Sequence, residues 1–241
     1  MLLLALAIAP GLAISLYIFF KDQYNREPRR HLVISFFLGI LSAGIALIAE
    51  TFLMPAARDV FPESILTTAI QAFLIVALVE EWSKYIMVRT YAFPKPEFDE
   101  PFDGIVYAVM VSMGFATIEN IGYVMEHGYT TAFLRMFLSV PAHASFAIIM
   151  GYNMGKAKFA GSKRTAYMLK GIFWAVFWHG SYDFFLFLQD NKLVREFISG
   201  GLLFLGALIS FLLAIRLSRN AIEEHVSLSK QMHHEDEQTI V

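Results

Sequence analysis

Two glutamates and a lysine at the end of an apolar run are the first residues in this chain that could do chemistry. Glu80, Glu81 and Lys84 follow the sequence AFLIVALV, inside an apolar stretch at 65–88. Four residues separate Glu80 from Lys84, so both lie on one helix face and can pair, whereas Glu81 points about 100° away. The structural alternative is a helix end whose charges reach the lipid headgroups. Two adjacent glutamates favour a buried carboxylate that acts as a general base on water.

Glu119 and Asn120 form a second polar group, in the apolar stretch 103–125. An isolated ionisable residue at the centre of a bilayer costs about 2.5–3.5 kcal/mol, so such residues are candidates for function. A hydrogen bond to a neighbouring Ser or Tyr is the structural alternative for Glu119. Asp103, at the start of the same stretch, fits a capping position at the N-terminus of a helix.

Two histidines lie in the next two apolar stretches. His143 comes two residues after Pro141, which we expect to kink its helix about one turn earlier. His179 and Asp183 are four residues apart on one helix face, where the carboxylate can orient the imidazole or both can face one metal ion or one water. For His143 taken alone, hydrogen bonding between packed helices is an equal alternative.

The residue types that are missing narrow the chemistry further. The 241-residue chain contains no Cys, no GxSxG and no HExxH, which excludes disulfides, thiolate metal sites, a cysteine nucleophile and two common hydrolase motifs. Its net charge of −2 gives no reason to expect a nucleic-acid partner. What remains is water activated by carboxylates and imidazoles, or a path for protons or ions built from the same groups.

The elements that position these residues must be membrane helices. Hydrophobic residues make up 57% of the chain and charged residues 17%, against about 45–50% and about 25% in an average soluble domain. The hydrocarbon core needs about 20 apolar residues, and seven stretches qualify, at 2–20, 32–50, 65–88, 103–125, 132–154, 168–189 and 197–215. The predicted fold class is all-α, a polytopic membrane helix bundle of about seven transmembrane helices. Spans three to six form its four-helix catalytic core around a polar cavity, and the other spans are peripheral.

We interpret the chain as one membrane domain, 1–215, with the catalytic core at about 65–190 and a polar cytoplasmic tail at 216–241. Thirteen Lys and Arg residues fall in one set of alternate loops and the tail, and three in the other set. This bias predicts a multi-pass cell-membrane protein with its N-terminus outside and its C-terminus in the cytoplasm. The first span has no basic residues before it and no clear cleavage site, which favours a retained helix. The acidic and histidine-containing segment 233–237 is interpreted as solvated rather than metal-binding.

Some residues are better explained by packing than by chemistry. Gly151 and Gly155 have the spacing that lets two helices approach closely. Trp174 and Trp178 fit helix packing or lipid contact. Glu50, at the outer end of the second span, fits an interfacial, structural position.

At these positions the sequence resembles the PrsW family of intramembrane proteases, within the superfamily that includes the CAAX prenyl endopeptidases and the bacteriocin-processing Abi proteins. Three motifs carry the resemblance: EExxK at 80–84, FxxxEN at 115–120 and HxxxD at 179–183. The segment DGIVY at 103–107 and the segment from His143 to Tyr152 also look like the family. The motifs occur in order over about 75–185, each inside a predicted span.

The resemblance implies proteolysis of membrane-associated substrates within a lipid bilayer. One enzyme of this type is associated with site-1 cleavage of a membrane-spanning anti-sigma factor, so a single-span anti-sigma factor is one candidate substrate. Family-level classification as metalloproteases rests on the chemistry of the motifs, whereas related CAAX enzymes are argued to use a glutamate-activated water without an obligatory metal. The catalytic type therefore stays open between a metalloprotease and a glutamic-type protease.

Hydrolysis of a peptide bond needs an activated water, a polarised carbonyl and a proton for the leaving amine. We hypothesise that Glu80 is the general base on water, supported by Glu81 and limited by the charge of Lys84. Glu119 with Asn120 would complete the water site.

The histidines would supply the remaining functions. His179, oriented by Asp183, and His143 would polarise the carbonyl or bind a metal. If a metal takes part, Glu119, His143 and His179 form a plausible ligand set for Zn²⁺ or another divalent cation, with an open position for water; otherwise no cofactor is needed.

The alternative function is a proton- or ion-coupled transporter that uses the same buried charges. Transporters more often show repeated halves and helices interrupted at matching positions, and neither half of this chain resembles the other. A scaffold without catalytic activity does not explain so many costly polar groups. The sequence therefore favours an intramembrane peptidase.

Overall fold

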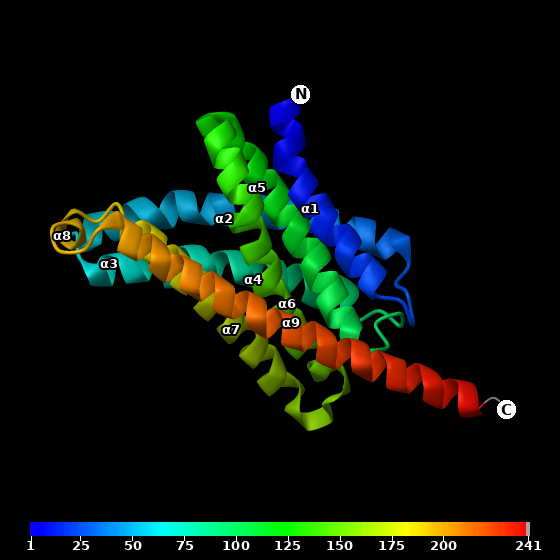
Figure 1. Ribbon diagram of the computed structural model, residues 1–241. Coiled ribbons are helices and arrows are strands. Elements are labelled where there is room, and N and C mark those ends of the chain that lie inside the picture. The colour runs from blue at the N-terminus through cyan, green and yellow to red at the C-terminus, as the bar shows by residue number, and fades with distance from the viewer. Residues whose placement is uncertain (240–241) are drawn as a thin grey trace.

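The computed structural model describes the backbone of residues 1–239 and the side chains of residues 1–234. Every regular element in this part of the chain is a helix (Figure 1), which confirms the predicted all-α membrane bundle. Of the tail segment interpreted as solvated, the side chains of 235–237 lie outside the described residues.

The helices follow one another with short connections. In chain order they are α1 (Leu2–Lys21), α2 (Arg29–Val60), α3 (Ile65–Ala69), η1 (Ile70–Ala77), α4 (Leu78–Met87), η2 (Val88–Ala92), α5 (Pro101–Phe137), α6 (Ser139–Phe159), η3 (Gly161–Lys163), α7 (Arg164–Phe187), α8 (Lys192–Arg195) and α9 (Gly200–Thr239). The elements from α3 to η2 join end to end and form the predicted third span. Five segments of the described chain are long and apolar enough to cross a membrane, and one of them, Pro101–Phe159, contains two of the predicted spans.

The chain reverses direction inside α5. Gly128 has φ 78° and ψ −158°, a conformation that residues with a side chain rarely adopt. Beyond it, Arg135 hydrogen-bonds to Glu119 and Asn120, although sixteen residues of straight helix would span about 24 Å. Residues 101–127 and 129–137 are therefore two antiparallel arms, which lie side by side in green in Figure 1. We call residues 129–137 the return arm.

A second break separates the return arm from α6. Leu138 has φ −115° and ψ −70°, well away from the values of a regular α-helix, and it separates α5 from α6. Pro141, one turn later, has no N–H to offer the carbonyl of Phe137, and its ring crowds that carbonyl. The kink predicted about one turn before Pro141 is confirmed.

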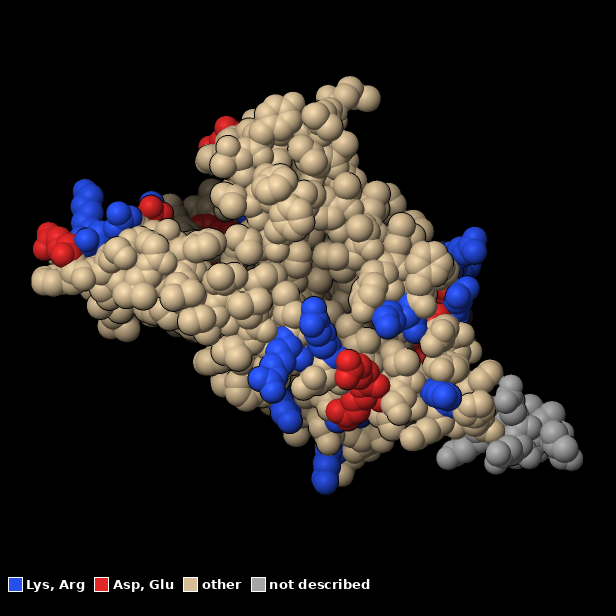
Figure 2. All heavy atoms as spheres, in the orientation of Figure 1, with Lys and Arg blue, Asp and Glu red and all other residues tan. Residues whose placement is uncertain are grey.

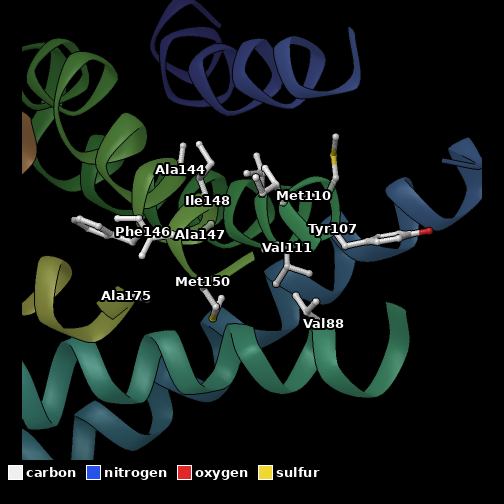
Figure 3. Packing of buried hydrophobic residues seen from close by; sticks show 14 of the residues in the cluster. Val88, Tyr107, Met110, Val111, Ala144, Phe146, Ala147, Ile148, Met150 and Ala175 are labelled. Carbon is white, nitrogen blue, oxygen red and sulfur yellow. The ribbon is translucent and has the colours of Figure 1, made fainter. Parts of the chain in front are cut away.

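Close contact between α5 and α6 builds the centre of the bundle. A Cβ atom on Gly104 would clash with the backbone of Gly151 and Gly155, so only glycine permits this approach. The close packing predicted from the Gly151 and Gly155 spacing is confirmed. Around this contact, Figure 3 shows apolar side chains of α5 and α6, including Tyr107, Met110, Phe146 and Met150, packed between the surrounding helices.

The other long helices are less enclosed. Within the most apolar window of each segment, 56% of residues are buried for Pro101–Phe159, against 28% for α1, 33% for α2 and 28% for α9. Large apolar side chains such as Phe37, Phe52 and Leu202 are exposed on these outer helices, as expected for surfaces that face lipid. The prediction that the first, second and last spans are peripheral agrees with this arrangement.

The bundle has two chemically different ends. The loops 22–28, 93–100 and 160–163 form one end, which we call the basic end. The turn at Gly128 and α8 lie at the other, which we call the opposite end. Lys158 donates hydrogen bonds to the carbonyls of Phe93 and Lys95 and so joins elements of the basic end. Figure 2 shows most of the visible lysines and arginines at the lower centre and along the right side, with a smaller group at the far left and a wide surface without charged residues between them.

The α9 helix continues through the predicted boundary at 216 and packs on the basic end. The Ser218 hydroxyl donates to the carbonyl of Ser145 at 2.9 Å, and the His225 ring stacks on Tyr152 with centroids 4.4 Å apart. Lys156 forms an ion pair of 2.8 Å with Glu224. The first part of the polar tail is therefore a packed helix that contacts α6.

Candidate active site

A lysine ammonium lies at the centre of the candidate site. Lys84 on α4 has no exposed surface, and its Nζ lies 2.8 Å from Glu81 Oε1 and 3.1 Å from Glu80 Oε2. The same atom lies 3.3 Å from His143 Nδ1 and 3.9 Å from the centroid of the Phe115 ring. The predicted pair of Glu80 and Lys84 is confirmed. Glu81, which was expected to point about 100° away from Glu80, also contacts Lys84, because a side chain three residues away on a helix is within reach.

His179 on α7 contacts carboxylates with both ring nitrogens. Its Nδ1 lies 2.9 Å from Glu81 Oε1, and its Nε2 lies 3.1 Å from Asp183 Oδ2 and 4.0 Å from Glu80 Oε2. Ionised carboxylates only accept hydrogen bonds, whereas a neutral imidazole donates from one nitrogen only. This arrangement therefore accommodates one extra proton, either as an imidazolium or on one of the carboxyl groups.

His143 on α6 has two different neighbours. Its Nε2 lies 2.9 Å from Glu119 Oε2, and its Nδ1 faces the ammonium of Lys84. A carboxylate can only accept and an ammonium can only donate. The geometry thus assigns His143 a neutral ring with its proton on Nε2, donated to Glu119, and with Nδ1 accepting from Lys84.

Glu119 and Asn120 on α5 join the site to two further segments. Arg135 donates from Nη2 to Glu119 Oε2 at 2.8 Å and from Nε to Asn120 Oδ1 at 2.9 Å. The Asn120 amide donates to the carbonyl of Ala7 on α1 at 2.8 Å. Glu119 is therefore held between an arginine and a histidine, while Asn120 ties α5 to α1.

The structure brings all of the predicted site residues into one network of contacts, which runs through α4, α5, α6 and α7. The members are Glu80, Glu81, Lys84, Glu119, Asn120, His143, His179 and Asp183. These four helices are the predicted catalytic core. Their contacts define one continuous polar site inside the bundle.

Two members of the site were not predicted from the sequence. Arg135 belongs to none of the three motifs. Glu50 of α2 was interpreted as interfacial, but its Oε1 is buried without a hydrogen-bond partner, and it lies within electrostatic reach of Glu80, Glu119, Lys84 and His179. In both cases the available signal was a charged residue near an apolar stretch, without a motif around it.

Aromatic side chains and an irregular helix hold the site in shape. The His179 ring stacks on Phe146 with centroids 4.9 Å apart and meets the His143 ring edge-on at 5.1 Å. The π-helical stretch η1 precedes α4 and changes the rotation between its faces, and such stretches often lie next to functional sites. Phe73 of η1 packs where a side chain on Gly180 would lie, which lets α7 approach η1 closely.

The site opens toward one edge. Between 13% and 22% of the side chains of Asp183, Arg135 and Glu119 is exposed, whereas Glu80, Glu81 and Lys84 are 0–6% exposed. Figure 2 shows acidic atoms at the bottom of a recess beside the upper part of α5. Glu119 and Asp183 lie at this more exposed edge, and Glu80 and Glu81 lie deeper in the bundle.

The buried residues also fit a divalent cation. One ligand atom each from Glu80, Glu81, His143 and His179 can be chosen so that all four lie within 4.8 Å of one another, and two carboxylates with two imidazoles are a donor set that suits zinc. The Lys84 ammonium already contacts three of these residues, which shows that the pocket favours a positive charge. Glu81 Oε2 is buried and without a hydrogen-bond partner.

The group of residues that could hold a metal differs from the predicted ligands. Glu119 was predicted to bind a metal with His143 and His179, but the group with converging ligand atoms contains Glu80 and Glu81 instead. Glu119 lies closer to the exposed edge of the site than Glu80 and Glu81 do, and the guanidinium of Arg135 balances its charge there. Its hydrogen bond to His143 is the usual second contact of a metal-binding histidine.

Comparisons with known proteins agree with the motifs. The chain matches the family described as PrsW family intramembrane metalloproteases over residues 27–215. It is 39% identical to Protease PrsW of Geobacillus kaustophilus over 189 residues, which cover 78% of this chain and 81% of that protein. It is 37% identical to Protease PrsW of Bacillus subtilis over 190 residues, or 78% and 84% of the two chains. No solved structure matches the chain.

Proposed function

The chain belongs to the PrsW family of intramembrane metalloproteases, and from this premise we propose that it hydrolyses a peptide bond in or near the membrane-spanning part of a membrane protein. The observation that carries the proposal is the buried network of Glu80, Glu81, His143 and His179 around Lys84. A peptide bond in a bilayer lacks water, so a protease must supply a polar cavity and an activated water there.

Glu80 is the general base in this proposal. Its carboxylate lies against Lys84, whose ammonium stabilises the charged form that can accept a proton, and 4.0 Å from His179. The oxygen of a water attacks the carbonyl carbon of the scissile bond while Glu80 takes the water proton. In this proposal the positive charge of Lys84 helps to stabilise the negative charge that then develops on the carbonyl oxygen.

His179 supplies the proton for the leaving amine. The extra proton that its two carboxylate contacts accommodate is available at Nε2, next to Asp183 and the more open edge of the site. When the carbon–nitrogen bond breaks, that proton passes to the amine nitrogen. The proton that Glu80 took from water then passes to His179, 4.0 Å away, which restores the starting state. Asp183 orients the ring for this transfer.

The metal-dependent and glutamic-type versions of the mechanism use the same residues in different roles, because a histidine that binds a metal carries no extra proton to give. Glu80, Glu81, His143 and His179 would hold a divalent cation, whose chemistry when bound is Lewis-acid polarisation of water and carbonyl. Exhaustive chelation of the purified protein, followed by activity measurement and elemental analysis, separates the two. Loss of activity that returns with Zn²⁺ supports the metal-dependent version, and full activity without metal supports the glutamic-type version.

We propose the same orientation in the membrane that the basic residues predict. The basic end faces the cytoplasm and the opposite end faces outward, so the open edge at Glu119 and Asp183 faces the outer half of the bilayer. A single-span membrane protein, such as an anti-sigma factor, fits this edge as a substrate. Its cleavage there corresponds to a first cut on the outer side.

Reconstituted protein tests the proposal. A panel of fluorescently labelled single-span proteins, incorporated into liposomes with the purified chain, is expected to yield two shorter fragments from at least one member. Glu80→Gln and His179→Ala should each lower the cleavage rate at least about 100-fold while the protein stays folded. Wild-type activity in Glu80→Gln would remove it as the base. Proton or ion uptake by the liposomes without cleavage would support the transporter alternative.

A further inference from the structure

Arg135 is a charged residue in an otherwise apolar part of the chain, and none of the three motifs includes it. It lies on the return arm, between the turn at Gly128 and the break at Leu138. A charged side chain in the hydrocarbon region is costly unless it is paired. The residues that Arg135 contacts therefore indicate its role.

Its guanidinium uses two nitrogens on two neighbouring residues of α5. Nη2 donates to Glu119 Oε2 at 2.8 Å, and Nε donates to Asn120 Oδ1 at 2.9 Å. The same group lies 4.1 Å from the centroid of the Tyr123 ring. A planar fork with several fixed donors can make both hydrogen bonds at once, whereas an ammonium can match the charge and only part of the geometry.

Arg135 and His143 contact the same carboxylate oxygen of Glu119. Glu119 Oε2 lies 2.8 Å from Arg135 Nη2 and 2.9 Å from His143 Nε2. The Glu119 carboxylate, held by the guanidinium, accepts a hydrogen bond from the Nε2–H of His143. This hydrogen bond fixes the ring with Nδ1 toward Lys84. Without the arginine, Glu119 would be free to rotate toward the open edge, because 22% of its side chain is exposed.

We propose that Arg135 is a positioning residue for the hydrolysis: it holds Glu119, and through Glu119 it fixes the orientation and tautomer of His143. This inference rests on the proposed function. Arg135 does not touch the reacting atoms, and its effect reaches them through two hydrogen bonds. The turn at Gly128 is what places the return arm, and with it Arg135, against Glu119.

Substitutions of Arg135 separate positioning from simple stability. Arg135→Gln should lower kcat about 10–100-fold, in the range found for outer partners of catalytic histidines, with KM changed less than about twofold. Arg135→Lys should recover part of the loss, because it keeps the charge. In the double variant with Glu119→Gln, the second substitution should add little to the loss caused by Glu119→Gln alone. Arg58→Gln, an exposed arginine at the end of α2, is the matched control.

A spectroscopic readout tests the inference without any substrate. In protein labelled with ¹⁵N-histidine, the signals of His143, assigned by their absence in His143→Gln, are expected to show a proton fixed on Nε2. Arg135→Gln should shift them toward a mixture of tautomers, while Arg58→Gln leaves them unchanged. If the wild-type protein cleaves nothing, the proposed function fails and this spectrum still decides the role of Arg135.

Opposite results would overturn the inference. Unchanged kcat and unchanged His143 signals in a folded Arg135→Gln protein would show that Arg135 does not position the site. Losses that simply multiply in the double variant would show that it acts independently of Glu119. If Arg135→Gln does not fold, Arg135→Lys decides: wild-type kcat with a displaced His143 signal contradicts the proposal, and a reduced kcat with a displaced signal supports it.

Discussion

At the scale of single residues, the site is organised by which groups can donate and which can only accept hydrogen bonds. Lys84 donates to Glu80, Glu81 and His143, and this one ammonium joins residues of α4 and α6. Helical spacing alone correctly placed Glu80 with Lys84 and Asp183 with His179. It could not show that Lys84 also reaches Glu81, since that depends on the rotamers that packing selects.

The contact between Asp183 and His179 leads to a prediction for catalysis. Asp183→Asn keeps the shape of the side chain but removes the charge that orients the ring at 3.1 Å, so kcat should fall about 10–100-fold. Asp190→Asn, seven residues further along and exposed, is the control. The rates are measured with the reconstituted cleavage assay, and equal rates for the two variants would contradict the orienting role.

A second prediction concerns Glu27, outside the membrane-spanning segments at the basic end. Burial raises the pKa of Glu27 to about 7 from its usual 4.5, although a hydrogen bond from Tyr107 lowers it. The folded state therefore holds this proton more tightly than the unfolded chain. The resulting stability is fully present below about pH 4.5 and is lost as the pH rises through about 7.

Thermal unfolding in detergent at several pH values tests this sign. The unfolding temperature should fall between about pH 5 and pH 8, and Glu27→Gln should reduce that fall. It should not abolish it, because burial also raises the pKa of Asp22 to about 6 and of Glu100 to about 7. Glu196→Gln, an exposed glutamate at the opposite end, should leave the pH dependence unchanged. A rise in stability toward pH 8 would contradict the account.

At the scale of elements, apolar stretches of the sequence predicted the helices well, whereas their interruptions were harder to see. The predicted span at 103–125 corresponds to the first arm of α5, whereas the predicted span at 132–154 covers the end of the return arm, the break at Leu138 and most of α6. Pro141 predicted the break at Leu138, because proline has no N–H to donate to the carbonyl four residues earlier in the helix. The position of Arg135 beside Glu119 was not predictable, since it depends on the angle at which the return arm leaves Gly128.

The contact between α5 and α6 gives a prediction for stability. Gly104→Ala would place a methyl group against the backbone of Gly151 and Gly155, so the helices would have to separate and the unfolding temperature should fall. Overpacking of this kind typically costs about 1–3 kcal/mol. Gly44→Ala, on α2 with open space around its Cβ position, should unfold at or above the wild-type temperature. Equal losses in both variants would show that the close approach is unimportant.

At the scale of the whole molecule, the charge distribution predicts an orientation that the absence of cysteine makes easy to test. With Cys absent from the chain, single cysteines can be introduced at Thr130, next to the turn at Gly128, and at Ser162, at the basic end. A maleimide that does not cross membranes should label Thr130→Cys on intact cells and Ser162→Cys only after lysis. The reverse pattern would place the open edge toward the cytoplasmic half of the bilayer.

The whole-molecule prediction from sequence was correct in fold class and family because both depend on long patterns and on ordered motifs. The residues that could hold a metal could not be predicted in the same way. They are the residues whose ligand atoms converge with those of His143 and His179, and these are Glu80 and Glu81 rather than Glu119. Neither helical spacing nor composition determines which carboxylates converge on the two histidines.

We propose that the buried glutamates and histidines hydrolyse a peptide bond within the membrane. Mass spectrometry of the fragments from reconstituted cleavage in H₂¹⁸O is the decisive test. We expect a cut in or within a few residues of the membrane-spanning segment, one ¹⁸O atom incorporated at the new carboxyl terminus, and neither product with Glu80→Gln. Fragments cut far from the membrane, or formed equally by Glu80→Gln, would contradict it.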